Sequence, residues 1–241
     1  MKQHESFSRK TYFCQKSTSM SVETKFPVTF AERLELGADI VRVSATWEEY
    51  LDLLEECDFQ IEYDNEQIIL MSIASDPHEV ITSNIITCLS NGLNDEPDMA
   101  VRGSNRHVFI EEFQKDYSPD AHIVKGEPVI YVLRKGLTAN TNPWLVVEIL
   151  SPSTFVRDMK EKLPFYKKIP SLRHILYIQQ DRPMVTVYNR VGESAVWETI
   201  DYDRIEDAFT VAGQPIYLKD VYKKVVFMGG PEKGKRNGKK K

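Results

Sequence analysis

Residues 144–154 read WLVVEILSPST, and no other segment says more about the architecture. The part before the first serine is apolar except for one acid, Glu148. A strand covered on both faces has this composition, because neither face meets water. The serines and threonine that follow offer helix caps at Ser153 or Thr154. The segment therefore predicts a central strand that leads into a helix reaching about Lys168.

Two helix starts precede this strand. A capping box, in which a threonine N-cap is followed three residues later by a glutamate, begins a helix over residues 47–57 at Thr46. The sequence Asp-Pro-His-Glu begins a second helix, with Asp76 as its N-cap and a proline in its first turn. Strand-like runs rich in β-branched and aromatic residues make up most of the rest. They are residues 59–63, 67–72, 107–113, 119–124, 128–133, 175–178, 184–188, 195–199 and 215–218.

Interleaved helices and strands predict one α/β (α+β) domain over residues 46–226, with a mixed central sheet flanked by helices and extra C-terminal strands. Residues 1–25 are polar without a sustained period, and we expect a disordered tail there. Residues 26–45 include a short apolar segment, expected to pack on the domain as an arm. Residues 227–241 form a Gly/Lys-rich tail, either flexible and solvated or a weak phosphate-binding arm.

Composition narrows the class of protein. The hydrophobic share of 41% and the charged share of 28% are those of an ordinary globular chain. A net charge of -5 argues against a non-specific nucleic-acid coat, although an enzyme that gathers carboxylates at its centre remains compatible with it. The three cysteines lack metal-ligand spacing, and no apolar run approaches the ~18 residues of a membrane span. We therefore expect a cytoplasmic protein without a membrane segment.

Two carboxylates are candidates for a metal site. Glu148 sits among apolar neighbours, and a buried charge is costly unless it is paired or binds a metal. Asp120 follows Pro119, which starts an extended segment, so Asp120 opens a strand. Two strand carboxylates at the same level of a sheet can hold Mg²⁺ through oxygen ligands. The alternatives are a salt bridge from Glu148 to a neighbouring strand and a turn in which Asp120 accepts from a nearby N–H.

A third candidate lies on the helix after the central strand. Lys162 and Tyr166 are four residues apart and share one helix face. A lysine at this place could hold a water or a phosphate oxygen, and the alternative is an ordinary solvated helix lysine. Pro164 would remove a helix hydrogen bond and kink the helix, which bears on the direction of Lys162.

The order of these residues resembles the Uma-type family of putative restriction endonucleases, in the PD-(D/E)XK, restriction-endonuclease-like superfamily. The resemblance covers about residues 46–226 and rests on Pro119-Asp120, the run VEILSPST over 147–154, and Lys162 with Tyr166. It implies that Asp120 and Glu148 bind a divalent metal, Mg²⁺ or Mn²⁺, with the carbonyl of Ile149 near them.

The same resemblance assigns further residues. Most of the superfamily has a lysine two residues after the metal-binding glutamate, where this chain has Leu150. In this branch the lysine is expected from the following helix, at the place of Lys162. Glu62 matches another acidic position, which would act at the metal or merely order a hairpin. His78 matches a position that would take part in catalysis or only cap and pack the second helix.

The activity implied is metal-dependent hydrolysis of phosphodiester bonds in nucleic acid, with DNA as the expected substrate. A homodimer is expected too, because cutting two strands takes two sites. One alternative is a catalytically inactive module on the same fold that binds nucleic acid or a protein, which Leu150 and Pro164 favour. Another is an assembly protein with no nucleic-acid role, which would show no salt-dependent DNA binding.

Overall fold

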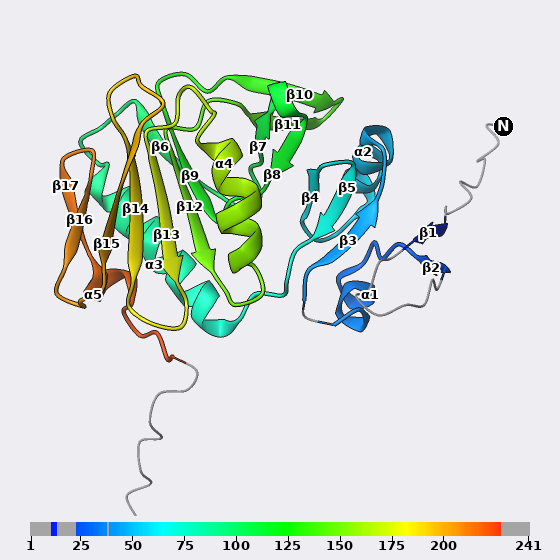
Figure 1. Cartoon of the computed structure of the whole chain (residues 1–241), viewed down its shortest axis with the longest axis horizontal. Helices are drawn as coiled ribbons and strands as arrows, with labels where there is room; N and C mark the ends of the chain where they lie inside the picture. The colour runs from blue at the N-terminus through cyan, green and yellow to red at the C-terminus, as the bar shows by residue number, and fades with distance from the viewer. Residues whose placement is uncertain (1–10, 14–22, 38, 228–241) are drawn as a thin grey trace, which may run out of the picture.

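The computed structural model describes residues 11–13, 23–37 and 39–227 (Figure 1). Two large sheets carry the chain, with few helices around them, so the predicted α+β class is confirmed. The sheet that holds the central strand has six strands. In spatial order they are β15 (Trp197–Tyr202), β14 (Val185–Arg190), β13 (His174–Gln179), β12 (Leu145–Leu150), β9 (Ala121–Lys125) and β6 (Met99–Gly103).

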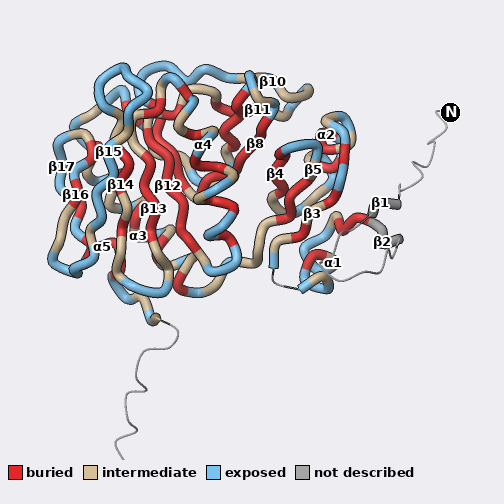
Figure 2. Tube along the Cα trace, viewed as in Figure 1, coloured by how far each residue is buried: buried red, intermediate tan, exposed pale blue. Residues whose placement is uncertain are grey.

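The predicted central strand is β12, and it is buried at every position. It runs parallel to β13 and antiparallel to β9, so the sheet is mixed. Alternate side chains enter different cores, because successive residues of a strand point to opposite faces. Leu145, Val147 and Ile149 pack with α3 (Asp76–Gly92), whereas Val146 and Leu150 pack with Tyr166. Figure 2 shows β12 and β13 as the most continuously buried strands.

The second sheet has seven strands and is built mostly from the first part of the chain. Helix α2 (Trp47–Glu56) packs on it through Tyr50, Leu51 and Leu53. Its strands, in spatial order, are β10 (Ile130–Arg134), β11 (Leu137–Asn140), β7 (Val108–Ile110), β8 (Lys115–Tyr117), β4 (Ile61–Asp64), β5 (Gln67–Leu70) and β3 (Val41–Ser44). A short 3₁₀ turn, Glu111–Phe113, joins β7 to β8.

The two ends of the chain are described only in part. Short strands β1 (Thr11–Phe13) and β2 (Glu23–Lys25) pair with each other, and the rest of the predicted N-terminal tail lies outside the described residues. The predicted arm over 26–45 contains α1 (Phe30–Glu35) and β3, which pairs with β5. Extra C-terminal strands occur as predicted, namely β16 (Ala208–Val211) and β17 (Gln214–Tyr217), followed by α5 (Leu218–Val221). Residues 228–241 of the Gly/Lys-rich tail lie outside the described residues.

Two predicted helix caps are wrong. Ser75 is the N-cap of α3, because its hydroxyl accepts the N–H of His78, and Asp76 lies inside the first turn, where its charge suits the helix dipole. After β12, the Oγ of Ser151 accepts the N–H of Thr154 at 3.1 Å, so neither Ser153 nor Thr154 supplies that cap.

The predicted third helix is irregular. A π-helical segment, Arg157–Lys162, comes before α4 (Leu163–Tyr166). The helical part ends at Tyr166, short of Lys168. No helix in the described part of the chain is long and apolar enough to cross a membrane.

The capping box of α2 is present as predicted and gives a stability test. Thr46 Oγ1 accepts the N–H of Glu49, and the Glu49 carboxylate accepts the N–H of Thr46. We expect Thr46→Ala to lower the free energy of unfolding by about 1 kcal/mol, because the N-terminal N–H groups lose their acceptor. Urea unfolding followed by circular dichroism measures it. Thr46→Ser keeps the hydroxyl and should behave as wild type; an equal loss in both variants would contradict the role of the cap.

Candidate active site

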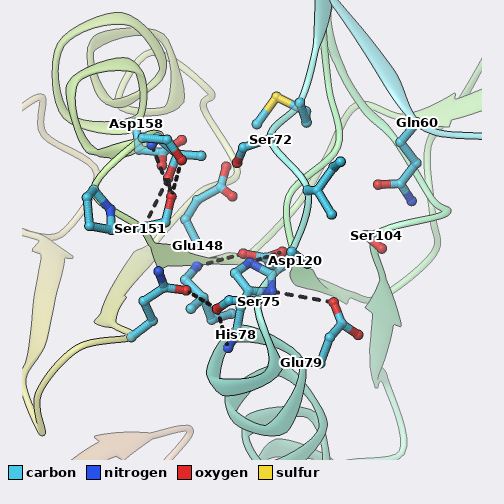
Figure 3. A pocket seen from close by; sticks show the side chains of 18 of the residues that line it. Gln60, Ser72, Ser75, His78, Glu79, Ser104, Asp120, Glu148, Ser151 and Asp158 are labelled. Carbon is cyan, nitrogen blue, oxygen red and sulfur yellow. Dashed lines mark hydrogen bonds and ion pairs between the residues drawn. The ribbon is translucent and has the colours of Figure 1, made fainter. Parts of the chain in front are cut away.

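A cavity of about 490 Å³ opens where β12 ends, between the start of α3 and the turn that follows β12 (Figure 3). Five acidic side chains from different parts of the chain line it: Asp39, Glu79, Asp120, Glu148 and Asp158. The imidazole of His78 lines it as well. Within the described residues, neither lysine nor arginine contributes to the wall of this cavity, so its negative charge is not balanced at the surface.

Asp120 and Glu148 face this cavity because the pairing of β9 with β12 stops just before them. The last pair is Ala121 with Val147, so the backbone of the next residues along β12 is free of the β9 ladder. Ile149 donates its N–H to Asp120 Oδ2 at 2.6 Å instead. This bond fixes the aspartate beside the strand that carries the glutamate. The side chains of Asp120 and Glu148 are 17% and 5% exposed, respectively.

Glu148 is held from the side that faces α4. Its Oε1 accepts from Lys162 Nζ at 3.0 Å and from the Tyr166 hydroxyl at 2.7 Å. Lys162 is fully buried, which excludes the solvated-lysine alternative. Burial raises the pKa of Glu148 to about 8; the Lys162 charge opposes the rise, and neighbouring carboxylates such as Asp158 add to it. The charge of Lys162 therefore does not offset the cost of burying this carboxyl group away from water.

Behind Glu148 lies a buried ion network that connects the two large sheets. Lys162 Nζ is 2.8 Å from Oε1 of Glu62, a residue of β4. Arg157 donates to Oε2 of the same carboxylate, and the N–H of Ser118 donates to Oε1 at 2.8 Å. Burial alone would raise the pKa of Glu62, but Lys162 and Arg157 outweigh it and lower the pKa to about 2. Glu62 is therefore a permanent anion, and it does not line the cavity.

The π-helical segment aims three charged side chains inward. Arg157, Asp158 and Lys162 are all buried; Asp158 and Lys162 are four residues apart and share one helix face, with Arg157 next to them in sequence. The N–H of Leu163 donates to the carbonyl of Asp158, five residues back, which widens the turn. Pro164 lies in the first turn of the α-helical part that follows, where its missing N–H costs least. The expected kink therefore does not turn Lys162 away from Glu148.

Two cavity residues had no firm role from the sequence. His78 Nε2 is 3.3 Å from Asp120 Oδ1, and that carboxylate raises the pKa of the imidazole against the opposing effect of burial. Asp158 is buried, and its Oδ1 has no hydrogen-bond partner among the described residues. Burial raises the pKa of Asp158 to about 6. The sequence alone assigned no function to Asp158.

The donor atoms fit a hard divalent cation that keeps part of its water. Within residues 11–13, 23–37 and 39–227, no three His, Cys, Asp or Glu side chains form a ready-made metal cluster. Asp120 and Glu148 nevertheless offer carboxylate oxygens in one acidic cavity. The N–H and C=O of one strand residue point to the same strand edge, so the carbonyl of Ile149 lies on the side of Asp120. Such a partial oxygen cage suits Mg²⁺, which uses few protein ligands.

Comparisons with known proteins identify the family of the chain. A family model described as "Putative restriction endonuclease", named Uma2, matches residues 47–215. An uncharacterised protein of Synechocystis sp. is 30% identical over 145 residues, which is 60% of this chain and 80% of that protein. Another from the same organism is 30% identical over 162 residues, 66% of this chain and 82% of that protein.

A solved structure shares the fold. A crystal structure described as a putative nuclease belonging to DUF820, from Anabaena variabilis, superposes with a TM-score of 0.57. The match covers 73% of this chain and 97% of that one, at 18% sequence identity. At that identity the likeness concerns the fold alone.

The buried network predicts strong coupling between two of its members. Arg157→Met should lower the free energy of unfolding by about 3–5 kcal/mol, because Glu62 keeps its charge with one cation fewer. Adding Glu62→Gln to that variant should restore part of the loss, since the uncompensated charge is gone. Urea unfolding of both single variants and the double variant gives the coupling energy. Additive losses would show that the pair is not coupled.

Proposed function

The chain belongs to the Uma2 family of putative restriction endonucleases, and we propose that it is a divalent-metal-dependent nuclease hydrolysing phosphodiester bonds of DNA. The observation that carries the proposal is the pair of carboxylates at one cavity, Glu148 on β12 and Asp120 immediately before the adjacent strand β9. The solved relative described as a putative nuclease supports the fold on which the proposal rests.

The two oxygens of Glu148 have separate tasks in this proposal. Oε1 is engaged by Lys162 and Tyr166, whereas Oε2 accepts no hydrogen bond from the described residues and is the oxygen left for a cation. Asp120 is oriented by Ile149 and His78, so its carboxylate is preorganised before any ligand arrives. A bound Mg²⁺ or Mn²⁺ would supply Lewis acidity to the scissile phosphate and acidify the attacking water.

Lys162 acts through Glu148 in this proposal. Its ammonium lies among three carboxylates, at 2.8 Å from Glu62, 3.0 Å from Glu148 and 3.6 Å from Asp158. To contact a water or a phosphate directly, it would have to give up these partners. We therefore assign Lys162 the task of holding Glu148 in place and balancing its charge. Glu62 in turn holds Lys162 and Arg157.

DNA, a homodimer and a cytoplasmic location are further parts of the proposal. Cleavage of both strands of a duplex takes two sites, which a two-fold dimer supplies. Cys57 and Cys88 are free thiols, as suits a reducing compartment.

A second candidate function is an inactive module that binds nucleic acid or a protein through the same cavity. Two observations favour it: Leu150 occupies the place of the usual superfamily lysine, and Lys162 is buried away from the cavity wall. This candidate predicts nucleic-acid binding without metal binding or turnover. An assembly protein with no nucleic-acid role would instead show no salt-dependent binding at all.

Metal binding separates these candidates. The double variant Asp120→Asn/Glu148→Gln keeps the shape of both side chains, and we expect it to lose the calorimetric Mg²⁺ or Mn²⁺ signal and DNA cleavage together. Titrations are done with and without a non-cleavable oligonucleotide, because phosphate oxygens complete the cation's shell. Glu198→Gln/Asp203→Asn, at two exposed positions in and just after β15, is the charge-matched control and should bind and cleave as wild type. Wild-type cleavage by the double variant would refute the assignment.

The role of Lys162 gives a separate test. We expect Lys162→Met to reduce kcat by roughly 10²-fold or more, the scale of losing a preorganised electrostatic contact. Because the lysine acts through Glu148, metal affinity should fall as well. Loss of kcat with unchanged metal affinity would mean instead that Lys162 meets the substrate itself. Thermal unfolding of each variant checks that it still folds.

A further inference from the structure

A second hollow adjoins the acidic cavity and differs from it in charge. Its volume is about 520 Å³, and Asp120 and Ser104 line both hollows. Beyond Asp120 its walls come from α3, from the end of β6, which carries Arg102, and from the connection between β6 and β7, which carries Arg106. Ser104 lies on the side of Asp120 away from Glu148 and Asp158 (Figure 3). A groove therefore runs over Asp120 from an acidic end to a basic end.

The end of β6 and the turn after it, which carry the two arginines, are fixed relative to Asp120. Gly103 pairs with Ala121, the residue after Asp120, so the register of β6 on β9 sets the position of the turn. Ser118, two residues before Asp120, donates its hydroxyl to the Ser104 carbonyl at 2.6 Å. The strand register and this hydrogen bond thus fix the distance between the basic end of the groove and the carboxylates.

Both guanidinium groups have hydrogen-bonding capacity left over. Arg102 donates one bond, from Nη1 to the Ala100 carbonyl of its own strand, at 2.8 Å. Arg106 donates from Nε to Asn140 and from Nη1 to Thr138, so among the described residues its Nη2 has no partner. Burial lowers the pKa of Arg102, and the nearby charge of Arg106 lowers it further. Both arginines line this hollow, and two positive charges in one wall favour an anion there.

We propose that Arg102 and Arg106 bind backbone phosphates of a DNA strand beside the scissile phosphate, and so hold the strand across Asp120. The inference rests on the proposed nuclease function and deepens it, by giving the substrate a path through the groove. Guanidinium groups suit this task, because their planar donors match phosphate oxygens. The acidic end repels phosphates until a cation is present, whereas the basic end attracts them without one. DNA binding at the basic end of the groove can therefore be separated from cleavage at the acidic end.

The test measures the salt dependence of DNA binding. A fluorescently labelled DNA duplex is titrated with the full chain in Ca²⁺ buffer at several salt concentrations, and Mg²⁺-dependent cleavage is assayed separately. Each phosphate contact contributes about 0.9 to the slope of log K against log salt. We expect Arg102→Ala and Arg106→Ala each to weaken binding several-fold and to reduce the slope by about that amount. Arg204→Ala, at an exposed arginine between β15 and β16, removes the same charge and should leave the slope unchanged.

Arg102→Ala, together with one further variant, Arg102→Lys, keeps the test decisive. Arg106 has structural bonds to β11, so Arg106→Ala also risks the fold; Arg102→Ala loses only a bond within its own strand. Arg102→Lys keeps the charge and should keep most of the slope. If wild type binds and cleaves DNA and Arg102→Ala binds with the same slope, the groove assignment is wrong and the nuclease proposal stands. If wild type neither binds nor cleaves DNA, both are wrong.

Discussion

The fold and the candidate site depend on one buried ion network, in which the carboxylate of Glu62 holds Arg157 and Lys162. Glu62 comes from the seven-stranded sheet, and both cations come from the helical segment that follows β12 of the six-stranded sheet. Buried charges are expensive to desolvate, so the network exists only if every member finds its partner. Its geometry therefore fixes how the two large sheets are placed relative to each other. Because Lys162 also donates to Glu148, the network fixes the position of that carboxylate as well.

The network also separates two kinds of acid. Glu62 has two cations and stays ionised, whereas Glu148 and Asp158 share the remaining positive charge of Lys162 and have raised pKa values. A cavity lined by undercompensated carboxylates attracts cations, and a cavity without them would not. Lys162 therefore fixes the shape of the site, but its single positive charge does not balance the carboxylates around it. The arginines beyond Asp120 lie outside this local balance.

Much of the architecture could be predicted from the sequence, because local patterns determine it. The apolar run over 144–150 identified the central strand, and the capping box at Thr46 identified α2. The caps at Ser75 and Ser151 were missed, since several neighbouring residues could serve and only the backbone turn chooses between them. The π-helical segment was also missed, because its widened turn depends on buried charged partners that come from distant strands. For the same reason the sequence placed Lys162 on the helix but could not show its carboxylate partners.

The network joins residues far apart along the chain: Arg157 and Glu62 are 95 positions apart. Contacts of such sequence separation form late in folding, because long loops must close before they gain any stabilisation. The strands β9 and β12 can pair early, yet Arg157 and Lys162 lack the Glu62 carboxylate until the seven-stranded sheet docks. Cation affinity would then arise at the last step of folding rather than gradually. A newly made chain would carry its acidic cavity in finished form only once the whole domain has assembled.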